Sequence, residues 1–262
     1  MHPIVEIMFG DFLALAADQI VNHASKYGWI YGGDAEVPLV IRTPMGGRRG
    51  YGPTHSQTLE PMFLGVPGLT VVSPSHLLEP GELLARSVRE VPGPVLFVEN
   101  KLLYARRLVP SSGERLGDFF VRGASESCFP TLRLSLVESG DPYAAIVCYG
   151  GNVPLALEAA ERLLIDDEVV CDVVVPSMIS PLPLDEIAAF TADCQRVVVF
   201  EEAPRRGGWG GELVAELAEL YPAASRTYAR VAAPDSPIPS SKSLEDDLLP
   251  GVDALVHAVR AP

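Results

Sequence analysis

Residues 42–57 combine several side-chain types that could do chemistry. This segment follows a predicted strand, contains four glycines and two prolines, and places His55 between Thr54 and Ser56. Glycines let a backbone approach a ligand closely, and a histidine on such a loop can donate or accept a proton near neutral pH. His55 is therefore the candidate catalytic residue. An exposed or capping histidine would fit the same pattern, and the spacing does not decide between the two.

Phe9 and Phe12 bracket a turn that directly follows the first predicted strand. Aromatic rings at the carboxyl end of a strand can stack on a planar ligand, so both residues are candidates for ligand binding. Ordinary core packing explains them equally simply, and composition alone favours that interpretation.

Three polar stretches carry weaker signals. Residues 205–211 (Arg-Arg-Gly-Gly-Trp-Gly-Gly) precede a predicted helix whose N-terminus could hold an anion. They lack the spacing of known phosphate loops, which favours a tight turn. Glu201 and Glu202 are adjacent in a predicted strand and should face opposite sides, so we do not expect an acid–base pair. The acidic residues within 244–247 are expected to be solvated.

The remaining histidines and the cysteines show no metal-ligand spacing. These histidines are His2, His23, His76 and His257. The cysteines are Cys128, Cys148, Cys171 and Cys194, and none of them forms a Cys-x-x-Cys pair. We expect buried free thiols and no metal site.

An α/β framework is expected to position these candidates. Strand-like runs alternate with helical patterns, which is typical of parallel sheets. The first half predicts strands at 4–9, 37–42, 69–73 and 95–99, and helices at 13–25 and 79–89. The second half continues the alternation through 144–149, 154–164, 169–175, 185–190, 196–201, 211–220, 226–231 and 252–260.

Residues 106–136 have little periodicity and are predicted to be a linker. We therefore expect two α/β units, residues 1–130 and 131–262, with a boundary near residue 130. Ligands of such sheets bind at the carboxyl ends of the strands, which is where the loop with His55 begins.

The composition excludes several classes of protein. The chain has 262 residues, of which 48% are hydrophobic and 21% charged, so a folded core is expected. It contains no apolar run of about 18 residues, and its start resembles no signal peptide, which predicts a cytoplasmic protein without membrane partners. A formal net charge of −14 disfavours nucleic-acid binding through phosphate neutralisation.

Several segments, in order along nearly the whole chain, match a known family. They are residues 3–12, 18–22, 32–33, 37–44, 54–57, 67–74, 98–104, 156–160, 201–204 and 239–250. With these segments the chain resembles the β subunit of the decarboxylating component of 2-oxo-acid dehydrogenase complexes, of the pyruvate, branched-chain and acetoin types. The match is specific in the first unit and looser in the second.

The resemblance implies a thiamine-diphosphate-binding α/β fold. The first unit would be part of a transketolase-like pyrimidine-binding domain, and the second a transketolase C-terminal domain. Phe12 matches the aromatic residue that packs on the aminopyrimidine, with Phe9 beside it. His55 matches the active-site histidine near the thiazolium and the incoming acceptor. The expected cofactors are thiamine diphosphate and Mg²⁺, bound mainly by a partner chain.

The resemblance has gaps as well. No segment here corresponds to the part of the family that precedes Pro3 and carries the glutamate contacting the aminopyrimidine. The Gly-Asp-Gly motif for diphosphate and magnesium is absent too. Missing elements would expose sheet edge and core. The resemblance therefore implies a split enzyme, in which an α-subunit-like chain supplies both parts, and an α2β2 assembly. Residues 87–92 match a monovalent-cation loop of some relatives, but Pro92 leaves a cation near Glu90 open.

The reaction implied by the resemblance is cleavage of a C–C bond next to a carbonyl, in a 2-oxo acid such as pyruvate. The acyl unit would then pass to a thiol on a lipoyl or acyl carrier protein. Two alternatives stay open. One is transketolase-type transfer of a two-carbon unit from a ketose phosphate to a carrier-protein thiol, in specialised metabolism. The other is non-enzymatic, a scaffold or docking subunit.

Overall fold

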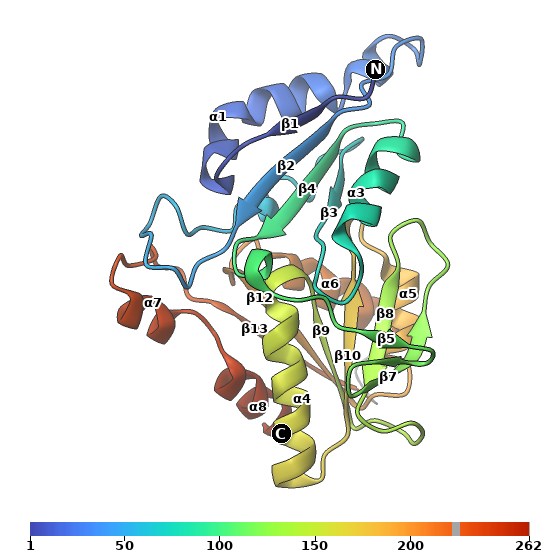
Figure 1. Ribbon diagram of the computed structural model, residues 1–262, viewed down its shortest axis with the longest axis vertical. Helices are drawn as coiled ribbons and strands as arrows, with labels where there is room; N and C mark the ends of the chain where they lie inside the picture. Colours follow the sequence, from blue (N-terminus) through green and yellow to red (C-terminus); the bar gives the residue numbers. More distant parts are fainter. Residues whose placement is uncertain (222–225, 262) are drawn as a thin grey trace.

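The computed structural model describes residues 1–221 and 226–261, and its strands form two sheets (Figure 1). The first sheet has the order β1-β2-β4-β3-β11 and is parallel except for β11. Its strands are β1 (Ile4–Glu6), β2 (Val40–Met45), β3 (Thr70–Val72), β4 (Val95–Asn100) and β11 (Met178–Ser180). β1 lies at the edge of this sheet.

The second sheet has the order β13-β12-β9-β10-β8-β7-β6-β5. The strands β13, β12, β9 and β10 run parallel, whereas β8 to β5 form an antiparallel extension. The bounds are β5 (Ser111–Ser112), β6 (Arg115–Leu116), β7 (Phe119–Ala124), β8 (Thr131–Ser135), β9 (Ala144–Cys148), β10 (Cys171–Pro176), β12 (Arg196–Pro204) and β13 (Thr227–Ala233).

The predicted helices are present, and two further helices, at residues 27–30 and 242–248, were not predicted. Those of the first half are α1 (Leu13–Asp18), which continues into the π-helical η2 (Gln19–Ala24), then α2 (Tyr27–Ile30) and α3 (Pro80–Arg89). Those of the second half are α4 (Val153–Asp167), α5 (Leu184–Phe190), α6 (Trp209–Leu220), α7 (Lys242–Leu248) and α8 (Val252–Arg260). Short turns are η1 (Gly10–Phe12), η3 (Glu60–Met62), η4 (Leu103–Ala105) and η5 (Gly150–Asn152). No helix in the described part of the chain is long and apolar enough to cross a membrane.

The predicted linker at residues 106–136 is wrong, because this region contributes β5 to β8 to the second sheet. Its sequence lacks strand periodicity because charged residues enter the sheet. Arg133 of β8 is buried, and its Nε donates to a carboxylate oxygen of the fully buried Asp172 at 2.6 Å. Arg122 of β7 also pairs with Asp172, at 3.3 Å. Because these paired charges occupy buried positions, the strands lack the apolar alternation that would have predicted them.

The two halves of the chain are joined in both directions. β5 to β7 precede the predicted boundary near residue 130 but belong to the second sheet, whereas β11 follows it and pairs with β3. One cluster of buried side chains also runs across both sheets and includes Leu13, Ile41, Val147, Ile179 and Trp209. The boundary itself stays a prediction, but the two units share a core rather than meeting through a linker.

The cysteines lie mostly in this core. All four are free thiols, and Cys148, Cys171 and Cys194 are buried, as the sequence predicted, whereas Cys128 is partly exposed. Burial raises the pKa of each of these thiols, which keeps them protonated and chemically inert at neutral pH.

Candidate active site

Phe9, Phe12 and His55 form one aromatic cluster at the carboxyl end of β1. The ring of Phe9 meets the His55 imidazole edge-on, with centroids 4.7 Å apart, and Phe12 does the same at 5.5 Å. The ring of Tyr51 also meets that of Phe9 edge-on, with centroids 6.3 Å apart. The structure thus brings together the three residues that the sequence singled out. Phe12 is 37% exposed, so its ring is not consumed by core packing.

The loop that carries His55 runs from β2 to η3 with an irregular backbone. Gly46, Gly50 and Gly52 have φ of 93°, 71° and 79°, which favour glycine. At Gly46 a side chain is also excluded by space, because a Cβ there would lie 2.4 Å from the amide nitrogen of Asn100. The glycines therefore let the loop fold back against the carboxyl end of β4. His55 is half-buried on it, and its Nδ1 lies 3.1 Å from Thr54 Oγ1.

Lys101, which directly follows β4, anchors this loop by hydrogen bonds. Its ammonium donates to the carbonyl oxygens of Gly46, at 3.0 Å, and of His55. The same nitrogen lies 5.0 Å from the centroid of the Phe9 ring, a cation–π distance. Burial lowers the pKa of Lys101, and the nearby carboxylates of Asp11, Glu202 and Glu245 act against this.

Asp11 fixes the far end of the loop. Its buried carboxylate lies between the two phenylalanines in sequence, and Oδ1 accepts hydrogen bonds from the backbone and side-chain nitrogens of Gln57, at 3.2 and 2.9 Å. Asp11 therefore ties the turn that presents Phe9 and Phe12 to the loop that presents His55.

Two buried glutamates of the second half accept hydrogen bonds from the glycine-rich part of the loop. Glu202 Oε1 accepts from the backbone nitrogen of Gly47, and Glu245 Oε2 accepts from that of Gly50, each at 2.6 Å. The prediction that the 244–247 run is solvated is thus wrong for Glu245, which is fully buried. It lies on α7, a helix that the sequence did not reveal, and faces inward while its neighbours Asp246 and Asp247 are exposed. Charge-assisted bonds of this length are among the stronger ones in proteins.

Glu201 points away from Glu202, as predicted from their adjacent positions in the strand. Its Oε1 accepts from the backbone nitrogen of Gly210 at 2.9 Å, at the first turn of α6. The glycine-rich segment 205–211 is therefore a tight turn, and the helix N-terminus that could have held an anion is occupied by this carboxylate. Burial raises the pKa of Glu201 to about 7.

Glu60 is a further buried acid, which no sequence pattern indicated. Tyr149 donates to its Oε1 at 2.8 Å, whereas Oε2 has no partner among the described residues. A cavity of about 20 Å³ adjoins Glu60, enough for a single water molecule. Burial raises the pKa of Glu60 to about 7.

Among the aromatic contacts of the described residues, His55 is the histidine that meets Phe9 and Phe12. His23 is exposed and 3.4 Å from Asp18, His257 is on the exposed side of α8, and His76 is buried. Within residues 1–221 and 226–261 no group of three His, Cys, Asp or Glu residues could hold a metal ion. The exposed ring of Phe12 suits a flat heteroaromatic group, whereas the part of the chain that the structure describes offers no comparable group of ligands for a magnesium-bound diphosphate.

Two family models match the chain. One, described as the pyrimidine-binding domain of transketolase, matches residues 1–107, and the other, described as the C-terminal domain of transketolase, matches residues 135–255. Among solved structures, a split-gene transketolase described as an inactive β4 tetramer superimposes with a TM-score of 0.69 at 20% identity, over 99% of this chain and 75% of that chain. This last likeness concerns the fold.

Curated relatives are similar over almost the whole chain. The β subunit of acetoin:2,6-dichlorophenolindophenol oxidoreductase of Cupriavidus necator is 33% identical, over 99% of this chain and 73% of its own length. The mitochondrial pyruvate dehydrogenase E1 component subunit beta-1 of Arabidopsis thaliana is 32% identical, over 98% of this chain and 68% of its own length.

The buried Glu60 predicts a pH dependence of stability. The pKa of Glu60 rises from 4.5 to about 7 on folding. Its contribution to the free energy of unfolding is therefore fully present below pH 4.5 and is lost as the pH rises through 7. Glu60→Gln should remove up to about 3 kcal/mol of this fall, leaving the parts due to Glu201 and Glu202, whose pKa values burial also raises. Urea unfolding of the full chain at about pH 5 and pH 8 measures it, with the exposed Glu126→Gln as control. An unchanged difference between the two pH values in Glu60→Gln would contradict the assignment.

The hydrogen bond between Glu245 and the Gly50 N–H predicts that Glu245 slows hydrogen exchange in the loop. Glu245→Leu leaves the Gly50 N–H without its acceptor, so amide hydrogen exchange in residues 46–52 should accelerate by about tenfold or more, the equivalent of a lost charge-assisted hydrogen bond. Glu245→Gln retains an acceptor oxygen and should show a smaller change. Asp246→Asn, on the exposed side of α7, is the control. Equal exchange in the leucine and asparagine variants would show that Glu245 does not order the loop.

Proposed function

Because the chain belongs to the β-subunit family of the thiamine-diphosphate-dependent E1 components of 2-oxo-acid and acetoin dehydrogenases, we propose that it is the β-type part of a split enzyme of this class. The enzyme would cleave the C–C bond next to the carbonyl of a 2-oxo acid such as pyruvate. It would then transfer the acyl unit to a lipoyl or carrier thiol.

The observation that carries this proposal is the joint placement of Phe9, Phe12 and His55. An exposed aromatic ring and an imidazole meet at the carboxyl end of a parallel sheet, the edge at which such sheets bind ligands. Both side chains sit on backbone that is tied down from several directions. A merely structural cluster would not need a half-exposed phenylalanine beside a histidine.

The residues would divide the work by their chemistry. Phe12, supported by Phe9, offers a ring face against which an aminopyrimidine can stack. Thiamine diphosphate, when bound, supplies the electron sink for cleavage next to a carbonyl. His55 would donate a hydrogen bond to an oxygen that gains negative charge, or exchange a proton with the acceptor thiol. Its backbone carbonyl is held by Lys101, so the imidazole keeps a fixed position relative to Phe12.

A partner chain would complete the site. It would provide the diphosphate-binding domain and the Mg²⁺ ligands. The edge strand β1 is suited to such a partner, because Ile4 and Val5 are 49% and 45% exposed and only one side of β1 is paired. Apolar side chains beyond the strand, among them Leu15 and Trp29, are even more exposed. Exposed apolar surface of this kind marks interaction sites. An α2β2 assembly in the cytoplasm fits this arrangement.

The role of His55 predicts a kinetic defect. In the complex purified with its partner chain, His55→Ala should slow acyl transfer by about 10² to 10⁴-fold, the range for loss of a general acid or base. Assembly should stay intact, since the loop is held through backbone contacts. The exposed His257→Ala is the control.

Unchanged turnover in His55→Ala would remove this residue from the mechanism. The same assay identifies the donor, because a 2-oxo acid releases carbon dioxide whereas a ketose phosphate does not. A complex that forms without thiamine diphosphate would instead favour a scaffold.

A further inference from the structure

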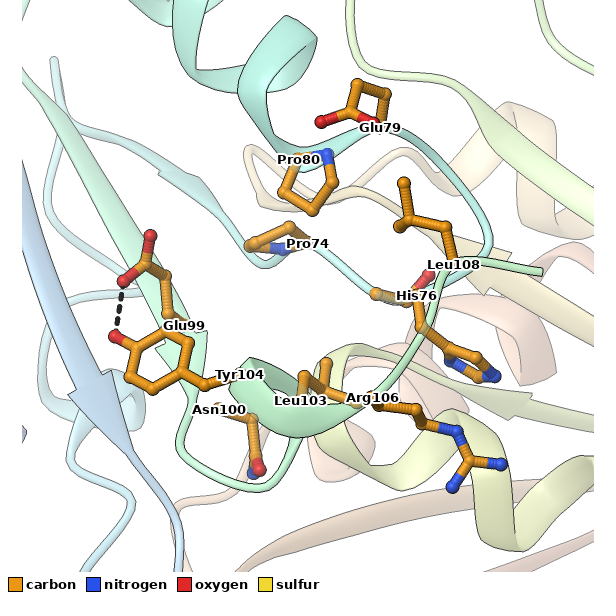
Figure 2. A pocket seen from close by; sticks show the side chains of 11 residues that line it. Pro74, His76, Glu79, Pro80, Glu99, Asn100, Leu103, Tyr104, Arg106 and Leu108 are labelled. Carbon is orange, nitrogen blue, oxygen red and sulfur yellow. Dashed lines mark hydrogen bonds between the residues drawn. The ribbon is translucent and has the colours of Figure 1, made fainter. Parts of the chain in front are cut away.

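A cavity of about 300 Å³ lies between the end of β4, the start of α3 and the segment that follows η4 (Figure 2). Its walls are mostly apolar and come from Pro74, Pro80, Leu103, Leu108 and the ring of Tyr104. This volume is at the lower end of the range for small-molecule sites. None of Phe9, Phe12 and His55 lines it, so the proposed reaction leaves it unused.

The acidic groups of this cavity are already engaged. Glu99 accepts two hydrogen bonds from Arg42, at 3.0 and 3.1 Å, and one from the Tyr104 hydroxyl at 2.6 Å. Glu79 accepts from the backbone of Gly81 at the start of α3. In Figure 2, Glu79 lies on the opposite side of the opening from Arg106. Arg42 therefore neutralises Glu99, whereas Glu79 is exposed and keeps its charge, so an anionic group is favoured only at the Arg106 end.

The basic end of the cavity has unused hydrogen-bonding groups. Arg106 lines the cavity from an exposed position, and among the described residues its guanidinium has no hydrogen-bond or ion-pair partner. His76, also in the wall, is only 4% exposed, and its buried Nδ1 is without a partner in the same part of the chain. Burial, with Arg106 nearby, lowers the pKa of His76 to about 4, so it is a neutral hydrogen-bonding group at pH 7.

We propose that this cavity binds a small organic monoanion, with an apolar or aromatic body between the prolines and leucines and one carboxylate held by Arg106 and His76. Guanidinium–carboxylate pairing supplies two parallel hydrogen bonds. The apolar walls select against inorganic anions and against polar sugars.

Ligand binding in the cavity would affect the position of His55 through the short segment 100–106. Asn100, Leu103 and Tyr104 line the cavity and flank Lys101, whose ammonium holds the carbonyls of Gly46 and His55. Asn100 also contacts the loop side directly, since its amide lies against Gly46. A ligand that orders residues 100–106 therefore orders the His55 loop, and the cavity is an effector site.

The test uses phenylacetate as the probe and phenylacetamide, its uncharged counterpart, as the control. Saturation-transfer NMR and calorimetric titration are performed on the full chain with its co-purified partner. We expect phenylacetate to bind and phenylacetamide to bind at least tenfold more weakly. Arg106→Gln should lower the affinity for phenylacetate by roughly tenfold or more. The adjacent Arg107→Gln has the same change in net charge but does not line the cavity, and should bind like the unaltered chain. Hydrogen exchange in residues 46–57 should slow when phenylacetate is present.

Three results would overturn the proposal. No phenylacetate binding would show that the cavity takes no such anion. Equal weakening by Arg106→Gln and Arg107→Gln would reduce the effect to surface charge. Binding that leaves exchange in residues 46–57 unchanged would refute the link to His55. Since none of these readouts requires turnover, they are independent of the proposed reaction.

Discussion

A single buried ammonium group, that of Lys101, is the interaction on which the candidate site depends. Lys101 is 5% exposed and lies where the loop of the first sheet meets the second half of the chain. The carboxylates of Asp11, Glu202 and Glu245 surround it and oppose the effect of burial on its pKa. Removing one ammonium and three carboxylates from water costs several kcal/mol per ion. That cost is offset only while all four keep their hydrogen bonds to the loop.

This constraint explains why the two halves of the chain cannot be treated as independent. The loop belongs to the first sheet, but two of its backbone N–H groups end on carboxylates of the second half. The shared hydrophobic cluster and the pairing of β11 with β3 bind the halves together from the other side. The position of His55 is therefore set by the docking of the second half, although no side chain of the second half belongs to the aromatic cluster.

The sequence predicted the parts of this structure that rest on local pattern. The parallel strands and the main helices follow from hydrophobic periodicity, and a glycine-rich loop after a strand drew attention to His55. The resemblance to a family supplied Phe12, for which composition alone favoured core packing. What the sequence did not predict rests on contacts between distant residues. Glu245 lies in an acidic run that appears solvated, and its burial depends on Gly50, far away in the chain.

The antiparallel extension was missed for a related physical reason. Arg133 and Asp172 occupy buried positions of neighbouring strands, and each is acceptable there only because of the other. Single-residue hydropathy places Arg133 at the surface, so the pattern of residues 106–136 indicated a linker. Lys101 and Glu60 share this property, because charged residues in a core become visible only when their partners are known.

Native mass spectrometry can decide whether this chain is one part of a split thiamine-diphosphate enzyme. The tagged chain is purified from its own cells, and the mass and cofactor content of the intact complex are measured. A split enzyme should appear as a complex of this chain with a second polypeptide, two copies of each, with thiamine diphosphate bound. A chain that is isolated alone, without a partner and without the cofactor, would contradict it.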